Sequence, residues 1–164
     1  MDRSGNRRRG AAHRPTLTRA TRRHPKHSKE NSPVLKHRSR RPSAPVDFDR
    51  LLQANLRRVF NERDAGLRAA AIAELYVADP IMYEPDAVIE GREAISAVAG
   101  KLLEQFGPDF RFTPQTDGVG HHGIGALRWH AGAPSTPHMV TGTDVAEIVD
   151  GRIARLWVLL NPTG

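Results

Sequence analysis

The spacing of apolar residues changes abruptly near Gly107 and Pro108. Before this point, apolar residues recur every three or four positions, which is typical of amphipathic helices. After it, apolar and polar residues alternate, which is typical of half-buried strands. A chain with helices first and a run of strands after them folds as an α+β domain, with the helices segregated to one face of the sheet. We therefore predict this fold class.

Three helices are predicted before the change. The first starts after Asp47, whose side chain can cap a helix, and should end near residues 61–64. The second is shorter and is expected to end at Asp79-Pro80, because proline disfavours a helical conformation in the residue before it. The third covers residues 92–106, where apolar positions keep the helical period until a Gly-Pro pair ends it.

The remaining elements are predicted strands. They fall at residues 81–84, 87–90, 110–112, 127–129, 138–149 and 152–161. Asp150-Gly151, between the last two strands, is a strong signal for a two-residue hairpin turn. The last four strands, joined by turns rich in Gly and Pro, form an antiparallel meander. Such a sheet, curved around the N-terminal helices, encloses an apolar cone.

The charge of the chain divides it into two parts. Residues 1–45 contain 14 Lys and Arg against 2 Asp and Glu, whereas the remainder contains 11 against 16. The first part has few large apolar residues, so we predict a disordered basic tail followed by one folded domain at 46–164. Three interpretations of the tail stay open. It is an inert solvated segment, it binds nucleic acid weakly and without sequence preference, or translation begins at Val46 and the tail is not made.

Composition also limits where the chain works. The sequence has no cysteine, which excludes disulfides and thiolate chemistry and suits a reducing compartment. No apolar run is long enough for a membrane span, and no apolar stretch follows the N-terminal arginine pairs as a secretory signal requires. We therefore expect a cytoplasmic protein without membrane association.

Asp144 is an unusual residue for its place in the pattern. In a strand it shares a face with His138, Val140, Gly142, Ala146 and Ile148, and this face is mostly apolar. A carboxylate on such a face lies either at an edge or in a cavity. The alternative for Asp144 is a structural role, in which it accepts hydrogen bonds from backbone or neighbouring threonines, or pairs with an arginine across the sheet.

The order of elements and four local phrases resemble the SnoaL-like branch of the nuclear transport factor 2-like superfamily, a cone-shaped α+β fold that includes ketosteroid isomerases and polyketide cyclases. The phrases are NERDA at 61–65, YVADPIMYEP at 76–85, IEGREAI at 89–95 and DVAEIVDGRI at 144–153. The resemblance covers residues 47–162. It implies the fold, but not one activity, because folds of this kind host many functions.

The resemblance implies two catalytic residues. Ketosteroid isomerases carry a general-base Asp before a proline at the end of the first strand, where this chain has Glu84. They carry a protonated Asp as oxyanion donor before the final hairpin, where this chain has Asp144. Their third group, a Tyr of the first helix, is matched by Leu56, which departs from the pattern for steroid isomerisation. The alternative for Glu84 is an exposed acid at a strand end.

Further residues are candidates for the binding site. They are the aromatic residues Tyr83, Trp129 and Trp157, together with His138 and Arg155. Core packing is the alternative for the aromatic residues, and a solvated position is the alternative for His138. Arg155 could instead pair with Asp144, which would keep the acid ionised or supply an Asp/Arg pair for water attack on an epoxide. No metal site is expected, because the histidines lack carboxylates at ligand spacing.

The predicted function is binding of a small apolar carbonyl compound in the cone by a homodimer that associates through the outer sheet face. If the protein is an enzyme, we expect a cofactor-free isomerase or cyclase that works by acid/base proton transfer with Glu84 and Asp144. A non-catalytic binding or association module of the same fold is the second hypothesis. Nucleic-acid binding through the basic tail is the third.

Overall fold

The computed structural model describes residues 45–161. The basic tail and the residues after Asn161 lie outside this range, so the predicted disorder and nucleic-acid affinity of the tail stay predictions. None of the helices within the described range is long and apolar enough to cross a membrane.

The helices follow the predicted pattern closely. Helix α1 (Phe48–Asn55) begins at Asp47, whose carboxylate accepts a hydrogen bond of 3.0 Å from the backbone N–H of Arg50. It continues directly into a short π-helical segment, η1 (Leu56–Phe60). Helix α2 (Ala65–Leu75) is capped in the same way by Asp64, and α3 (Arg92–Phe106) is bounded by two glycines with positive φ.

The predicted end of the second helix is wrong. Helix α2 ends at Leu75, and Tyr76 already belongs to the first strand, β1 (Tyr76–Glu84). Pro80 lies inside this strand, where the register to its neighbour shifts between Tyr76 and Ile81. Proline has no N–H to donate to a neighbouring strand. It is tolerated here because the regular ladder of hydrogen bonds is interrupted at this position.

The sheet contains seven strands in the order β2-β1-β7-β6-β5-β3, with β4 also paired to β5. Besides β1 they are β2 (Ala87–Glu90), β3 (Arg111–Pro114), β4 (Val119–His121), β5 (Ile124–Ala133), β6 (Thr136–Val149) and β7 (Arg152–Leu160). All pairs are antiparallel except β1 with β7, which run parallel. The short β4 was not predicted, because its Val-Gly-His sequence offers only one apolar residue.

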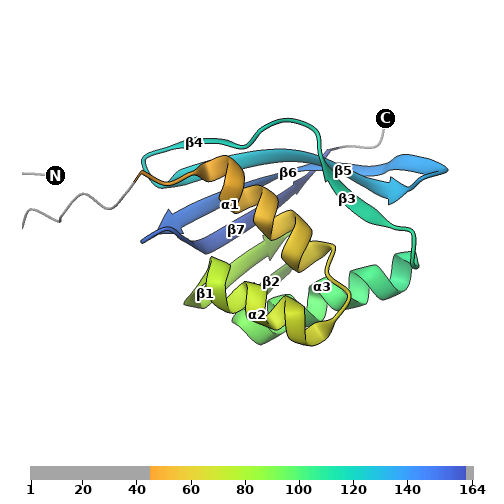
Figure 1. Cartoon of the computed structure of the whole chain (residues 1–164), viewed down its shortest axis with the longest axis horizontal. Helices are drawn as coiled ribbons and strands as arrows, with labels where there is room; N and C mark the ends of the chain where they lie inside the picture. Colours follow the sequence, from red (N-terminus) through yellow and green to blue (C-terminus); the bar gives the residue numbers. More distant parts are fainter. Residues whose placement is uncertain (1–44, 162–164) are drawn as a thin grey trace, which may run out of the picture. The chain divides into compact units, whose positions relative to one another are not determined.

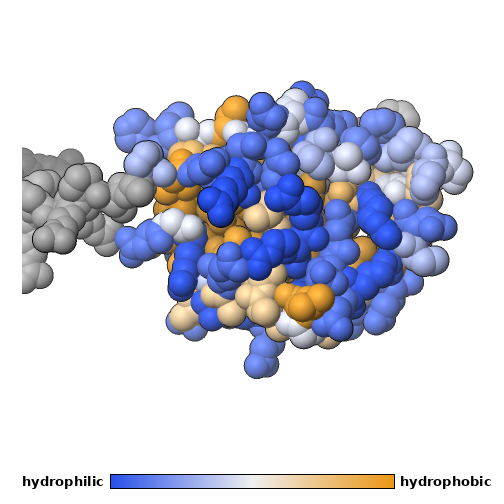
Figure 2. All heavy atoms as spheres, in the orientation of Figure 1, coloured by the Kyte–Doolittle hydropathy of each residue, from blue (hydrophilic) through white to orange (hydrophobic). Residues whose placement is uncertain are grey.

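The three α-helices lie on one face of the curved, open sheet (Figure 1). The face that carries α1 and α2 is mostly hydrophilic in Figure 2, as expected of amphipathic helices that turn their apolar stripes inward. The core between the two layers combines helix and strand residues, and its largest fully buried side chains include Tyr76, Phe110, Met82, Ile95 and Leu156. The predicted α+β architecture is confirmed.

The turn between β6 and β7, together with a register shift beside it, sets the register that matters for the site. Asp150 and Gly151 both have positive φ, 50° and 78°, as a type I′ hairpin turn requires. Counted from this turn alone, Asp144 would lie opposite Trp157, but a register shift between Glu147 and Ile148 places it opposite Val158 on β7. On its other side it lies opposite Leu127 on β5. The predicted hairpin and this shift together fix the position of the mid-strand acid.

Candidate functional site

Asp144 lies on the inner face of β6 and is only 4% exposed. Its Oδ1 accepts a hydrogen bond of 2.8 Å from the indole Nε1–H of Trp129, which lies on the neighbouring strand β5. Within residues 45–161, Trp129 is its only hydrogen-bond partner. Burial raises the pKa of Asp144 to about 7, although the hydrogen bond from Trp129 acts in the opposite direction. A large fraction of this buried acid is therefore protonated at neutral pH.

Glu84 is the last residue of β1 and is half-buried. It shares the inner face of the strand with Met82, which is fully buried. The strand ends here because Pro85 follows, and the turn returns at once to Ala87, the partner of Glu84 in the hairpin. Burial raises the pKa of the Glu84 carboxyl above its ordinary value. Glu84 is thus a more basic carboxylate than an exposed one.

Glu84 and Asp144 line one cavity of about 320 Å³. This volume is at the lower end of the range for small-molecule sites, which are typically concave and mostly apolar. The apolar lining comes from Leu56, Phe60, Pro85, Ala87, Leu102, Phe106, Phe110, Phe112, Trp129, Val140, Val158 and Leu160, and Asp86 adds a third acid. The structure therefore brings together the two predicted catalytic residues and the predicted binding residue Trp129.

The other aromatic candidates lie on the opposite face of the sheet. Tyr83 and Trp157 are register partners on β1 and β7, and their rings stack at 5.2 Å with an interplanar angle of 9°. Because Glu84 and Val158 face inward, their strand neighbours Tyr83 and Trp157 face outward. The prediction that these two residues line the same pocket as Asp144 is therefore wrong.

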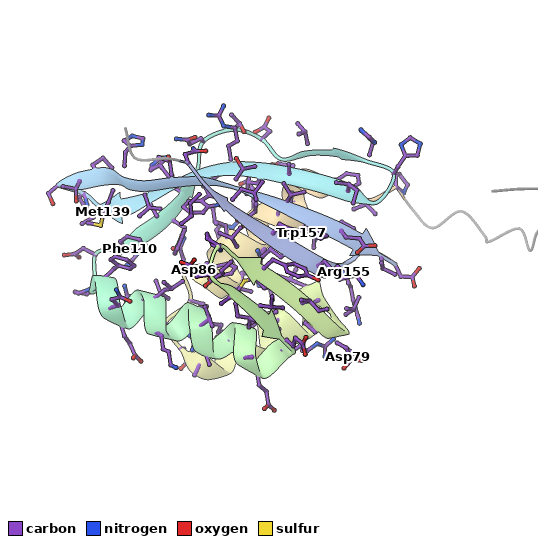
Figure 3. The ribbon with its side chains drawn as sticks, turned by 180° about the vertical axis from the view of Figure 1, so that it is seen from behind. Asp79, Asp86, Phe110, Met139, Arg155 and Trp157 are labelled. Carbon is purple, nitrogen blue, oxygen red and sulfur yellow. The ribbon has the colours of Figure 1, made fainter. Side chains whose placement is uncertain are left out.

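Arg155 also lies outside the cavity. Its guanidinium donates to the Glu147 carboxylate, a cross-strand partner on the outer face. Figure 3 shows Arg155 and Trp157 on β7, whereas Asp86 and Phe110 lie between the sheet and α3. The predicted alternative in which Arg155 pairs with Asp144 is wrong, and with it the Asp/Arg pair for epoxide opening.

His138 is exposed and does not line the cavity. Its ring packs against that of His130, with centroids 4.2 Å apart. The register between β5 and β6 shifts between Ala131 and Ala133, so β6 contains extra residues on this side of Val140. The strict alternation that predicted His138 on the face of Asp144 is therefore broken in this part of β6. The prediction of His138 as a binding residue is wrong.

Several cavity residues were missed from the sequence. Four phenylalanines meet there from η1, α3, the loop after it and β3: Phe60, Phe106, Phe110 and Phe112. Their alternation and helical spacing mark them as core residues, but no sequence signal distinguishes a cavity wall from solid packing. Asp86 was missed because acids in turns after proline are common.

A buried polar pair lies deeper in the core. The Tyr76 hydroxyl donates to Oδ1 of Asn55 at 2.7 Å, and both residues are fully buried. Burial, together with the nearby charge of Asp144, raises the pKa of Tyr76 well above its ordinary value, so the phenol stays protonated. Within residues 45–161 no group of three His, Asp or Glu side chains is arranged to hold a metal ion.

Comparisons with solved structures show the same fold. A candidate isomerase of the SnoaL-like family from Agrobacterium tumefaciens is 23% identical, with a TM-score of 0.65 over 71% of this chain and 98% of that chain. A candidate polyketide cyclase from Sinorhizobium meliloti is 20% identical, with a TM-score of 0.51 over 66% and 93%. A candidate ketosteroid isomerase from Kribbella flavida is 16% identical, with a TM-score of 0.55 over 72% and 80%.

The comparison with curated proteins gave no match. The family model described as SnoaL-like domain matches residues 54–156, which span α1 to β7 and include Glu84 and Asp144. This match covers more than half of the chain, and it agrees with the resemblance inferred from the local phrases and with the fold of the solved structures. The chain therefore belongs to the family of SnoaL-like domains.

Proposed function

We propose that this SnoaL-like protein binds a small apolar carbonyl compound in its cavity and catalyses a cofactor-independent proton transfer, as an isomerase or cyclase. The observation that carries the proposal is that Glu84 and Asp144, from different strands, line one largely apolar cavity. The names of the structural neighbours, isomerase and polyketide cyclase, support the same class of chemistry.

Glu84 acts as the general base. Its pKa is raised by burial, so its ionised carboxylate is a stronger base than an exposed one. It removes a proton from the carbon next to the substrate carbonyl. The electrons of that C–H bond form a C=C bond, and the π electrons of the carbonyl move onto its oxygen, which gives an enolate.

Asp144 acts as the acid that stabilises this enolate. Oδ1 accepts the hydrogen bond from Trp129, so the proton of the neutral acid resides on Oδ2. This O–H donates a hydrogen bond to the substrate oxygen. The apolar surroundings strengthen this hydrogen bond, because the local dielectric constant is lower than in water. Return of the proton from Glu84 to another carbon completes an isomerisation. In an aldol-type cyclisation, the enolate carbon instead forms a bond to a second carbonyl carbon of the same molecule, and the proton held by Glu84 passes to the alkoxide oxygen formed there.

A test that needs no knowledge of the natural substrate is hydrogen–deuterium exchange next to the carbonyl of β-tetralone, followed by NMR in D₂O. Replacement Glu84→Gln removes the base at nearly constant shape, and exchange catalysed by the protein should fall by at least about a hundredfold. Glu90→Gln is the matched control, because Glu90 is exposed on β2 and lies outside the cavity lining.

The alternative function is a binding module without chemistry. It predicts that β-tetralone binds but exchanges no faster than in buffer, and that Glu84→Gln changes neither property. Equal exchange by the wild type and the Glu84→Gln variant would therefore refute the catalytic role of Glu84.

We also propose that the protein is a homodimer that associates through the outer sheet face. One cross-strand row on this face is apolar over six strands, and consists of Val88, Tyr83, Trp157, Val145, Ala126 and Val119. Val88 and Val119 are 60% and 66% exposed. An apolar row of this length is unfavourable in water, and a second copy would cover it.

A further inference from the structure

The charged residues that line the cavity are all acidic. Glu84, Asp86 and Asp144 contribute carboxyl groups, and no Lys, Arg or His from residues 45–161 is in the lining. An anionic ligand would be held near like charge beside apolar walls, where Coulomb repulsion is less screened than in open solvent. A cationic group would instead gain attraction from the same carboxylates.

Aromatic rings surround the space between these acids. Phe110 stacks on Phe106 with centroids 4.5 Å apart and meets the edge of Phe112 at 5.4 Å. Phe112 in turn contacts Trp129 edge to face at 5.2 Å. Such rings stack on aromatic ligands, and their faces attract ammonium groups within roughly 6 Å. The walls therefore suit an aromatic ligand and tolerate a cation.

Depth separates the roles of the three acids. Asp144 is almost fully buried, whereas Asp86 is exposed in the tight turn between β1 and β2. Phe106 and Leu160, which are 37% and 49% exposed, line the cavity as well and mark its mouth. Asp86 contributes to the lining of the same cavity from this turn. A ligand with its carbonyl at Asp144 would therefore direct its other end towards Asp86.

We propose that the substrate is an aromatic carbonyl compound that is apolar except for a basic amine at its mouth-facing end, and that Asp86 is the residue that selects this charge. The inference rests on the proposed function for the orientation of the carbonyl. It goes further in assigning a charge class to the substrate and a specificity role to a residue outside the proton transfer.

The test compares three probes that differ only in one substituent: para-methylacetophenone, para-acetylbenzoate and para-(aminomethyl)acetophenone. Trp157→Phe leaves Trp129 as the sole tryptophan of the chain, so quenching of its fluorescence reports occupancy of the cavity. Binding is measured at low salt in this background, with and without Asp86→Asn. Glu90→Gln is the control for loss of an exposed acid elsewhere.

We expect the amine to bind at least about tenfold more tightly than the benzoate, with the neutral ketone between them. Asp86→Asn should weaken binding of the amine, tighten binding of the benzoate and change the affinity for the neutral ketone by no more than about twofold. Glu90→Gln should change none of the three affinities by more than about twofold. Equal or tighter binding of the benzoate, or an order that Asp86→Asn does not change, would overturn the proposal.

Failure to bind any probe, with the fold intact by circular dichroism, would also overturn it. None of these outcomes depends on turnover. The proposed proton transfer is judged separately by the exchange assay on Glu84→Gln, so the two proposals fail independently.

Discussion

The indole Nε1–H of Trp129 on β5 donates a hydrogen bond of 2.8 Å to Oδ1 of Asp144 on β6. This bond orients a buried acid so that one oxygen is held by the protein and the other is left for a ligand. It also limits how far burial raises the pKa of Asp144, because it stabilises the ionised form. One indole therefore controls both the direction and the protonation of the candidate acid.

Replacement Trp129→Phe keeps most of the ring and removes this donor. The pKa of Asp144 should rise above its value of about 7, because the replacement removes the hydrogen bond that lowers it and keeps the burial that raises it. The unpartnered buried acceptor should cost about 1–3 kcal/mol of unfolding free energy. NMR titration of the carboxyl carbon and urea denaturation measure the two effects. Trp157→Phe, on the other face of the sheet, should leave the pKa of Asp144 unchanged.

The stability of the protein should depend on the ionisation of Asp144. Its pKa is raised from 3.8 to about 7 on folding, so between these values the folded state binds the proton and the unfolded state does not. The unfolding free energy should therefore fall as pH rises through this window, by about 4 kcal/mol at most, and level off above it. In Asp144→Asn this contribution should disappear, as urea denaturation from pH 4 to 8 would reveal. Parallel curves for the two proteins would contradict the assignment.

The pH dependence of proton transfer should follow from the same two acids. The base Glu84 must be ionised and the donor Asp144 must be protonated, so exchange should rise as Glu84 loses its proton and fall as Asp144 loses its proton around pH 7. The expected result is a decline of exchange above neutral pH. In Asp144→Asn the alkaline decline should be lost together with most of the activity. A profile that stays flat to pH 9 would exclude Asp144 as the donor.

Gly142 provides a test from a position that never touches the ligand. A methyl group there would lie 2.6 Å from Cζ2 of Trp129 and 2.8 Å from the carbonyl oxygen of Leu159. Gly142→Ala should displace the indole, destabilise the protein by about 1–3 kcal/mol and raise the pKa of Asp144 as Trp129→Phe does. Gly151→Ala is a useful comparison. The positive φ of this position strains an alanine, but no atom lies within 4 Å of the added Cβ. The replacement should lower stability without affecting the pKa of Asp144.

The proposed dimer can be tested on the outer face alone. Trp157→Arg introduces a charge into the apolar row and should convert a dimer to a monomer, whereas Trp157→Phe should retain association. Light scattering after size exclusion distinguishes the two states. A wild-type protein that is monomeric at high concentration would refute the proposal.

Much of the fold could be predicted, because its signals are local. The period of the apolar residues located α3, the Asp-Gly turn located the β6–β7 hairpin, and an acid on an apolar strand face singled out Asp144. Glu84 was identified only through the resemblance to ketosteroid isomerases. Nothing in its own neighbourhood distinguishes it from an exposed acid at a strand end.

The remaining assignments depended on irregularities that local patterns do not contain. Counted from the Asp150-Gly151 turn without interruption, Trp157 would lie opposite Asp144 and face inward. The shift between Glu147 and Ile148 places it opposite Val145, so it faces outward. His138 follows a second shift in β6 that moves it away from the cavity. The four phenylalanines of the cavity lie on separate elements, and their meeting depends on the packing of the complete domain.

The parallel pairing of β1 with β7 has a consequence for the order of events during synthesis. β7 separates β1, which carries Glu84, from β6, which carries Asp144, so the two acids reach one cavity only when β7 inserts between their strands. β1 is made early and must wait, with a strand edge unpaired, until nearly the whole domain has left the ribosome. Contacts so distant in sequence form slowly. The nascent chain is therefore exposed to aggregation for most of its translation, and a chaperone that covers the free edge of β1 should raise its yield.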